Sequence, residues 1–298
     1  MQAYKFTSEE QKSIIDRFSE EFFCKVQNTL ISCAKKWHLV INEMIPYLSV
    51  NCIFSCHSEF YGEAILKIGY RLIETATEAG VLTDYSGHKY CRIYASDVEN
   101  GVLLIEMLSP GKSLYHDTDS DQRIKAFAKL YNDLHIPSFG KTNYPTYRGW
   151  IERFVKLAIN REDIREHGSK ALSLYDDLIQ TYNKSMLLHG DLHHNNIISD
   201  SDGYTIIDPK GVVGDPIFDC SRFIMEEFCD SLLPCKQDAV LSFVSKLGKE
   251  IGVPADVLLK CLYIETVIWM GEDLFYFNWL DDHMVENVLQ AEILMNLI

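Results

Sequence analysis

The part of this sequence that most constrains its fold is a polar loop, 189–196, which follows a short apolar strand. The loop reads His-Gly-Asp-Leu-His-His-Asn-Asn. After it, two short strands are predicted on either side of an Asp-Ser-Asp-Gly turn at 200–203. Because this hairpin returns the chain, we expect Asp208 to lie beside Asp191 and Asn196. Two carboxylates and one carboxamide oxygen would then meet in a small volume on rigid β supports.

These three side chains suit phosphoryl transfer. The carboxylate of Asp191 would orient the attacking hydroxyl and accept its proton, while Asn196 and Asp208 would hold Mg²⁺. The spacing Asp-x-x-x-x-Asn is that of the catalytic loop of kinases, with Gly190 where protein kinases have arginine. The sequence therefore predicts Asp191 as the catalytic residue and a Mg²⁺ site at Asn196 and Asp208, with ATP as the phosphoryl donor.

Two other interpretations of this loop stay open. His189, Asp191, His193 and His194 have a spacing at which histidine and aspartate ligate zinc in metal-dependent hydrolases. Such sites take further histidines from later in the chain, and only His283 follows this loop. A polar turn without chemistry is the other alternative, and it leaves a polar run between two apolar strands unexplained.

The sequence on both sides of the hairpin resembles a known family. His-Gly-Asp at 189–191 is similar to the antibiotic phosphotransferases. The segment 207–216, Ile-Asp-Pro-Lys-Gly-Val-Val-Gly-Asp-Pro, followed by Phe218 and Asp219, resembles the branch of streptomycin kinases and hydroxyurea phosphotransferases, where Asp-Pro-Lys replaces Asp-Phe-Gly. The resemblance to this aminoglycoside/hydroxyurea phosphotransferase family covers nearly the whole chain from Trp37 onward.

The resemblance implies a bilobal, protein-kinase-like α+β fold. We expect an N-lobe over 1–107, with a five-stranded antiparallel sheet and one central helix, and a mostly helical C-lobe over 108–298. Besides the hairpin, strands are predicted near 37–41, 46–55, 63–68, 90–94 and 102–107. Helices are predicted over 8–35, 72–85, 121–134, 150–159, 162–182, 219–228, 235–252 and 257–279.

The nucleotide side is predicted from the N-lobe. Lys67 lies in an apolar strand, where alternation turns it away from its neighbours, as in the phosphate-binding strand of kinases. Glu74 and Glu78 lie on the next predicted helix, and the family register favours Glu78 as the partner of Lys67. The resemblance also implies three residues near the nucleotide: Ser49 over the phosphates, and Glu106 and Met107 at the adenine.

Three other polar residues near the hairpin have predicted roles. In the family, a carboxylate at the position of Asp219 holds backbone N–H groups of the catalytic loop. Asp215 is expected to cap or turn the chain before Pro216. Lys210 would either meet phosphate or pair with a carboxylate of its own loop.

The substrate implied by the family is a streptomycin-like aminoglycoside, a small cation that phosphorylation inactivates. The formal charge of −15 argues against nucleic acid as a partner, whereas a negative cleft would steer a cation. Acidic residues of the late helices would line the pocket: chiefly Glu265, Glu272 and Asp273, and also Glu226, Glu227 and Asp230. A kinase of another small metabolite is the runner-up, and a non-catalytic binding protein on this scaffold is a third hypothesis.

Composition and cysteine usage predict a cytoplasmic protein that is not inserted in a membrane. No apolar run approaches the roughly 18 residues of a membrane span, and the N-terminus lacks the pattern of a signal peptide. The nine cysteines are scattered without paired spacings, and Cys52 and Cys56 are expected to be core thiols of a strand. A reducing compartment suits such a set.

Overall fold

The computed structural model of this 298-residue chain describes residues 4–46, 50–117, 119–141, 143–229, 231–277, 280 and 282–298. Contacts within it divide the chain into two compact units. Unit 1 consists of 1–111 with 199–207, and unit 2 consists of 112–198 with 208–298. The sequence predicted a single boundary between the lobes, after residue 107. In the structure the chain passes from unit 1 to unit 2 after residue 111, and the segment 199–207, which contains most of the hairpin, returns to unit 1.

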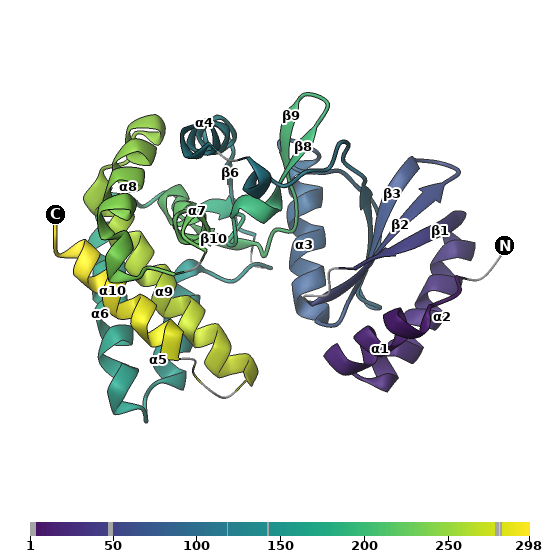
Figure 1. Cartoon of the computed structure of the whole chain (residues 1–298), viewed down its shortest axis with the longest axis horizontal. Coiled ribbons are helices and arrows are strands. Elements are labelled where there is room, and N and C mark those ends of the chain that lie inside the picture. The colour runs from purple at the N-terminus through teal and green to yellow at the C-terminus, as the bar shows by residue number, and fades with distance from the viewer. Residues whose placement is uncertain are drawn as a thin grey trace. The chain divides into compact units, whose positions relative to one another are not determined.

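Unit 1 is built on a five-stranded antiparallel sheet with the strand order β1-β2-β3-β5-β4 (Figure 1). Its strands are β1 (Leu39–Ile45), β2 (Asn51–Ser58), β3 (Gly62–Gly69), β4 (Ile93–Asp97) and β5 (Val102–Glu106). Leu66 and Ile68 of β3 are fully buried, as are Val102 and Leu104 of β5, so one face of these strands forms the core. The predicted sheet is confirmed, although β4 begins three residues later than the predicted strand at 90.

Three helices belong to this unit: α1 (Ser8–Arg17), α2 (Glu20–Lys36) and α3 (Leu72–Tyr85). α1 begins at a capping box, because Thr7 Oγ1 accepts from the Glu10 N–H at 3.2 Å and Glu10 Oε2 accepts from the Thr7 N–H at 2.7 Å. Phe22, Val26 and Leu30 of α2, at helical spacing, join the buried cluster of the sheet. The third helix, α3, has the predicted bounds.

The predicted hairpin forms a two-stranded sheet of β8 (Ile197–Asp200) and β9 (Gly203–Ile206). Its second strand is anchored in unit 1, where Ile206 donates its N–H to the Lys89 carbonyl at 2.8 Å and accepts from the Cys91 N–H at 2.9 Å. These bonds occupy the backbone around Tyr90, which pairs with Ile206 instead of extending β4. A contact more than a hundred residues away in sequence therefore sets the start of β4.

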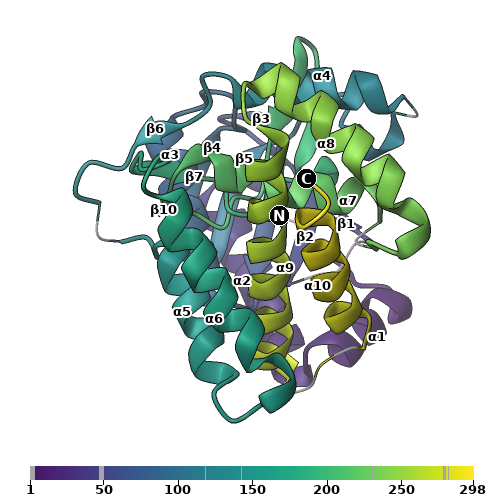
Figure 2. The same ribbon diagram turned by 90° about the vertical axis from the view of Figure 1, so that its left-hand side faces the viewer.

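Unit 2 is mostly helical, as predicted. Its α-helices are α4 (Ser120–Tyr131), α5 (Tyr147–Leu157), α6 (Glu162–Leu178), α7 (Ser221–Glu227), α8 (Gln237–Ile251), α9 (Ala255–Phe277) and α10 (Asp282–Met295). Four short 3-10 helices are η1 (Leu114–His116), η2 (His194–Asn196), η3 (Pro216–Cys220) and η4 (Pro234–Lys236). Figure 2 shows α9 between α5 and α6 on one side and α10 on the other. The helix α10 was not predicted.

A small sheet in unit 2 positions the polar loops. It contains β6 (Ile136–Pro137), β7 (Met186–Leu188) and β10 (Val212–Gly214) in the order β10-β7-β6. Val212 pairs with Leu188 in antiparallel register, so the chain leaves β7 at the point where it enters β10. The loop 189–196 after Leu188 and the Asp-Pro-Lys loop before Val212 therefore lie at the same edge of this sheet.

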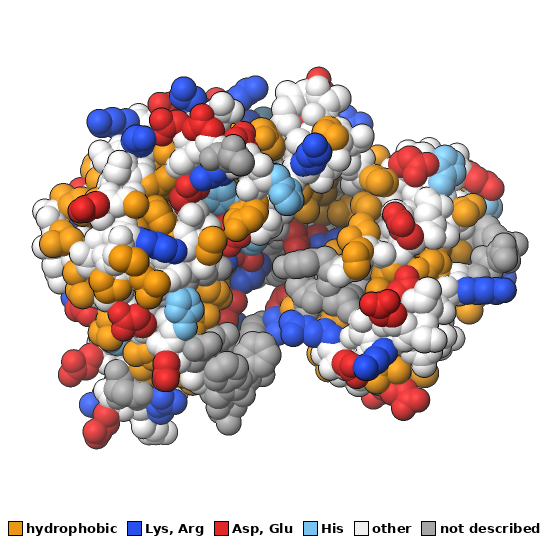
Figure 3. All heavy atoms as spheres, in the orientation of Figure 1, with side chains coloured by type: hydrophobic (Ala, Val, Ile, Leu, Met, Phe, Trp, Pro, Cys, Tyr) orange, Lys and Arg blue, Asp and Glu red, His pale blue; other side chains and the backbone are white. Residues whose placement is uncertain are grey.

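Three features of the structure bear on expectations from the sequence: the charged surface, the apolar character of the helices and the state of the cysteines. On the face in Figure 3, acidic side chains are spread over both units and basic side chains lie among them. None of the described helices combines the length and the apolar character needed to cross a membrane. None of the nine cysteines forms a disulfide, and burial raises the pKa of Cys52 and of Cys56 to about 12. Both are core thiols, as expected.

Candidate active site

The backbone of the catalytic loop is held by the buried carboxylate of Asp219, at the end of η3. Its two oxygens accept hydrogen bonds from the N–H groups of His189 at 2.9 Å and Gly190 at 2.8 Å. Nε2 of His135 lies 2.9 Å from the same carboxylate. Burial alone would raise the pKa of Asp219, but the bonds from His135 and Gly190 lower it below its ordinary value. The structure confirms this backbone-holding role for Asp219, and Asp215 caps η3 as predicted, accepting from the Ile217 N–H at 3.2 Å.

Glycine is required at position 190 for two reasons. Its φ is +81°, in the region that L-residues with a side chain rarely adopt. A Cβ there would also lie 2.7 Å from Cη2 of Trp150 and 3.0 Å from Cγ1 of Val212. The arginine of protein kinases would not fit at this position, which explains His-Gly-Asp in physical terms.

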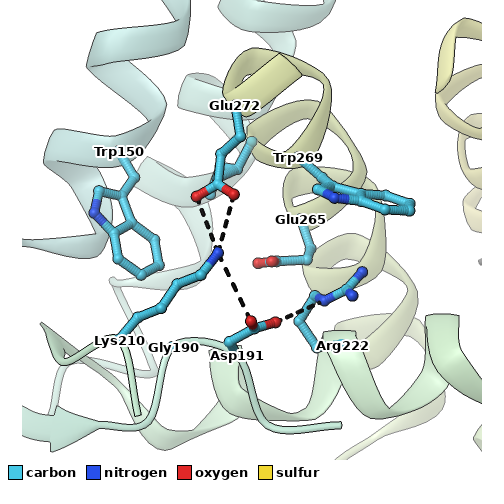
Figure 4. A pocket seen from close by; sticks show the side chains of 9 residues that line it. Trp150, Gly190, Asp191, Lys210, Arg222, Glu265, Trp269 and Glu272 are labelled. Atoms are coloured by element: carbon cyan, nitrogen blue, oxygen red, sulfur yellow. Dashed lines mark hydrogen bonds and ion pairs between the residues drawn. The ribbon is translucent and has the colours of Figure 1, made fainter. Parts of the chain in front are cut away.

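Asp191 presents an ionised carboxylate from this loop (Figure 4). Its Oδ1 accepts from Nε of Arg222 at 3.0 Å, and its Oδ2 lies 3.8 Å from Nζ of Lys210. Burial would raise the pKa of Asp191, but the charges of Lys210, His193 and Arg222 outweigh burial and hold it well below its ordinary value. The N–H of Asp191 donates to Nδ1 of His189 at 3.0 Å, which fixes the start of the side chain.

Asn196 and Asp208 have a donor set that suits Mg²⁺. Nδ2 of Asn196 donates to the carbonyl oxygen of Asp191 at 2.9 Å, so the carboxamide is oriented and its oxygen can serve as a ligand. Asp208 lies close enough to His193 for its charge to raise the pKa of that imidazole, although burial brings the value down to about 4 overall. One carboxylate and one amide oxygen are typical of Mg²⁺ sites completed by phosphates and water.

The zinc alternative finds no support in the described part of the chain. No group of three histidine, cysteine, aspartate or glutamate side chains is placed there to hold a metal ion. Nε2 of His194 lies 3.0 Å from Oε2 of Glu227, and its ring stacks on Phe223. His189 is fully buried and accepts from the backbone of its own loop. The histidines of the loop therefore do not converge on one point.

Lys67 and Glu78 form a buried ion pair in unit 1. Nζ of Lys67 lies 2.6 Å from Oε1 of Glu78, and the two side chains are 6% and 7% exposed. The alternative partner, Glu74, instead accepts from Nη1 of Arg71 at 2.9 Å. The preferred pairing with Glu78 is the one that the structure contains.

The other predicted nucleotide residues are only partly covered by the structure. Ser49 lies outside the described residues. Glu106 ends β5, and its carboxylate accepts from the Arg92 N–H at 3.1 Å. Glu106 and Met107 line a cavity of about 530 Å³, with other walls from the loop after α3 and the turn of the hairpin. Lys67 is not among the lining residues of this cavity, so a phosphate held by Lys67 would lie elsewhere.

Two of the three acidic residues predicted for the pocket, Glu265 and Glu272, have described side chains on α9. Glu265 and Glu272, two turns apart, both line a cavity that also contains Asp191 (Figure 4). Both oxygens of Glu272 accept from Nζ of Lys210, at 3.1 and 2.9 Å. Glu265 is buried and accepts from the phenol of Tyr147. The side chain of Asp273 and all of Asp230 lie outside the described residues, while Glu226 and Glu227 bond to Asn195 and Arg123.

Comparison with known proteins decides the family. The model of the family described as "Aminoglycoside/hydroxyurea antibiotic resistance kinase" matches residues 37–268. The chain belongs to this family. A streptomycin 3''-kinase from Klebsiella pneumoniae is 29% identical over 225 residues, which are 72% of this chain and 79% of that protein. A streptomycin 6-kinase from Streptomyces griseus is 27% identical over 161 residues, 52% of each chain.

Solved structures agree on the fold of this antibiotic resistance kinase. Choline kinase LicA from Streptococcus pneumoniae matches it with a TM-score of 0.66 at 14% identity, over 92% of this chain and 99% of that one. LicA has also been solved with AMP. The predicted kinase-like α+β fold is thereby confirmed, and the family confirms the predicted enzyme class, a phosphotransferase with an alcohol group as acceptor.

Among the residues that line the kinase's cavity, the sequence analysis missed Ile268 and three with a charged or aromatic side chain, Trp150, Arg222 and Trp269. Arg222 bonds to Asp191, and its guanidinium carbon lies 4.7 Å from the centre of the Trp269 ring. A signal for Arg222 existed, because an arginine inside the apolar segment 217–225 needs a buried anion as its partner. The two tryptophans have no comparable signal. Their apolar spacing on a helix fits a position in the core as well as it fits a position in the wall of a cavity.

Proposed function

We propose that the protein transfers the γ-phosphoryl group of ATP to a hydroxyl group of a streptomycin-type aminoglycoside and thereby inactivates it. The observation that carries this proposal is the carboxylate of Asp191. It stays ionised, it projects from a loop that Asp219 fixes, and its own carbonyl orients Asn196. The sequence similarity to two streptomycin kinases supports an aminoglycoside as the acceptor.

In this mechanism Asp191 orients the acceptor hydroxyl. The hydroxyl oxygen forms a bond to the γ-phosphorus, and the bond between that phosphorus and the oxygen bridging to the β-phosphate breaks. The electron pair of the broken bond leaves with ADP, and the hydroxyl proton passes to Asp191. Because the pKa of Asp191 is held low, its main contribution is alignment of the hydroxyl, and it releases the proton to water readily.

Asn196 and Asp208 would hold Mg²⁺ when it binds. The ion would neutralise charge on the transferred phosphates. The two residues fit this role because they supply hard oxygen ligands and no thiolate, and because Asn196 is already oriented by its bond to the carbonyl of Asp191. Lys67, fixed by Glu78, would contact the phosphates of ATP, and the segment with Glu106 and Met107 would lie near the adenine. AMP bound to the kinase LicA supports a nucleotide on this fold.

The acceptor would be recognised as a cation. Glu272 is 21% exposed at the cavity with Asp191, and Trp150 and Trp269 stand on opposite sides of the charged groups (Figure 4). Tryptophan faces and carboxylates are the groups that bind guanidinium and ammonium ions. The nine thiols without disulfides support a reducing compartment, the cytoplasm, as the place where this enzyme works.

The test is phosphoryl transfer by the purified protein, followed by ADP release and by the mass of the acceptor. Streptomycin should gain one phosphate, whereas sorbitol, a neutral polyol, should gain none. Asp191→Asn should lower kcat by about 10²- to 10⁴-fold, and Asp16→Asn, on the exposed side of α1, should match the parent. Transfer to hydroxyurea or choline but to no aminoglycoside would leave the kinase chemistry and refute the proposed acceptor.

A further inference from the structure

Each oxygen of the Asp191 carboxylate faces a cation of the protein itself. Arg222 bonds to one oxygen and Lys210 approaches the other, while Lys210 also bridges to both oxygens of Glu272 (Figure 4). The cavity that these groups surround holds about 50 Å³. That is room for one or two water molecules, far below the roughly 300 Å³ or more of a small-molecule site. The side chain of Asp191 is 22% exposed, but the cavity beside it is too small for a sugar ring, so we expect part of this cluster to move when the acceptor binds.

We propose that Lys210 is a further catalytic residue, which exchanges Glu272 for the phosphoryl group in transfer and so releases Glu272 to bind a cation of the acceptor. This inference rests on the proposed function and adds to it a role for the lysine of the Asp-Pro-Lys motif. It also names the event that opens the acceptor site.

The position of Lys210 brings its ammonium to the transferred phosphorus. A hydroxyl held by Asp191 lies about 2.7 Å from one of its oxygens, and the phosphorus it attacks lies roughly 3 to 3.5 Å further on. Nζ of Lys210 is already 3.8 Å from Oδ2 of Asp191. Lys210 also follows Asp208 by two residues on the same loop, so a metal ligand and the ammonium come from one short segment. The phosphoryl oxygens would therefore fall within reach of a lysine side chain.

The exchange is favourable because the phosphoryl group carries more negative charge than Glu272. The Lys210 side chain is 32% exposed and its stem is flexible, so it can turn without a change of fold. Once Lys210 turns, Glu272 keeps no ammonium beside it and remains between two tryptophans at the cavity wall. A partly buried carboxylate without a counter-ion is costly, which favours entry of a guanidinium or ammonium group. The nucleotide and a cationic acceptor would then bind cooperatively.

The bonds that form and break are those of the proposed phosphoryl transfer from ATP to the acceptor hydroxyl. Lys210 keeps its proton throughout. It contributes charge to the developing transition state and forms no bond to phosphorus. Arg222 stays on Asp191, because its guanidinium is also held over the Trp269 ring. Lys210 is thus the movable cation of the cluster, and Arg222 is the fixed one.

A purely structural role for the Lys210–Glu272 bridge makes the opposite prediction. If the bridge only ties α9 to the loop, its removal loosens the site and weakens acceptor binding under every condition. If Lys210 withholds Glu272 until the nucleotide arrives, its removal strengthens acceptor binding in the absence of nucleotide. Acceptor affinity without nucleotide therefore separates the two roles.

The experiment is calorimetric titration of streptomycin into the full-length protein, with and without the ATP analogue AMP-PNP and MgCl₂. The parent should bind streptomycin more tightly with the analogue, by a factor in the range of about 5 to 150 that is usual for coupled sites. Lys210→Met should bind it at least about as tightly without the analogue as the parent does with it, so that the ratio falls to about one. Its kcat should fall by about 10²-fold or more.

Three further variants complete the design. Lys210→Arg should keep the linkage, and Glu272→Gln should bind weakly in both conditions. Lys260→Met, which removes a surface ion pair with Asp256 on the same helix, should behave as the parent. Circular dichroism and a melting curve confirm folding of each variant, and Lys210→Gln, which also removes the ammonium, replaces Lys210→Met if that variant does not fold.

The outcomes separate this inference from the proposed function. Phosphorylation of streptomycin by the parent, together with an unchanged linkage in Lys210→Met, would overturn the role of Lys210 and leave the proposed function standing. Weaker binding by Lys210→Met without nucleotide would assign the bridge a structural role and also overturn it. A parent that phosphorylates no aminoglycoside would instead refute the proposed function, and this inference with it.

Discussion

The buried carboxyl group of Glu265 makes the stability of this kinase depend on pH. Glu265 lies on α9 with 5% of its surface exposed and accepts a hydrogen bond from the phenol of Tyr147. Burial raises its pKa from the ordinary 4.5 to about 7, although the bond from Tyr147 and the charges of Arg222 and Lys210 work in the other direction. The side chain is therefore neutral in the folded protein at pH values where it is ionised in the unfolded chain.

The sign and the size of the effect follow from this difference. Because the folded pKa is raised, the stabilisation from Glu265 is fully present below pH 4.5 and is lost as pH rises to about 7. A rise of about 2.5 in pKa corresponds to roughly 3 kcal/mol. Glu265→Gln stays neutral at every pH and keeps an oxygen for the phenol. We expect it to match the parent near pH 4.5 and to exceed its free energy of unfolding by up to roughly 3 kcal/mol at pH 8.

Urea unfolding measured between pH 4.5 and pH 8 tests this prediction. Tryptophan fluorescence is a suitable signal, because Trp150 and Trp269 line the same cavity as Glu265. Asp256→Asn is the matched control, since Asp256 lies on α9 with its side chain 44% exposed, and its stability should follow the parent at each pH. A Glu265→Gln variant with the same pH dependence as the parent, or with lower stability at pH 8, would refute the reasoning.

Three further substitutions give results that differ in kind. Gly190→Ala should lower the melting temperature by several degrees and nearly abolish activity, because its Cβ would meet Trp150 at 2.7 Å and its φ is +81°. Gly203→Ala isolates the effect of the clash, because Gly203 also has a positive φ, +140°, but open space around it. Asp219→Asn should lower kcat at least about tenfold with little change in the Michaelis constant for ATP, as steady-state kinetics would show, because one loop N–H loses a charged acceptor. Lys67→Met should instead raise the Michaelis constant for ATP and destabilise the fold by about 3 kcal/mol or more, measured by urea unfolding, because the buried carboxylate of Glu78 loses its ion pair with Lys67.

Local sequence signals predicted the elements that local interactions determine. The helix over 72–85 has its predicted bounds because apolar spacing defines it throughout, and the capping box at Thr7 marks the start of α1. The turn at 200–203 placed the hairpin correctly for the same reason. The loop 189–196 could likewise be predicted from the sequence, because Asp191 and Asn196 lie in one short motif whose spacing is typical of kinases.

Elements that depend on distant contacts could not be predicted from local patterns. The strand β10 has only three residues and exists because Val212 pairs with Leu188. The helix α10 was missed because the apolar run of α9 was extended to residue 279, so the acidic helix-start signal at Asp282 was not recognised as the beginning of a separate helix. The start of β4 was placed too early because Tyr90 pairs with Ile206 of the hairpin.

The charge of the cavity shows why composition alone gives an incomplete account of the acceptor site. An acidic chain with glutamates on α9 predicted a negative pocket, yet the carboxylates of Asp191 and Glu272 face the cations Lys210 and Arg222. Glu265 adds only part of a charge near neutral pH, because burial raises its pKa to about 7. The resting cavity is thus close to neutral, and a cationic acceptor gains an uncompensated carboxylate only when one of the internal cations is drawn away. Under the exchange that we propose for Lys210, the phosphates held beside Asp208 would draw this lysine away, and affinity for a cationic acceptor would then depend on nucleotide binding.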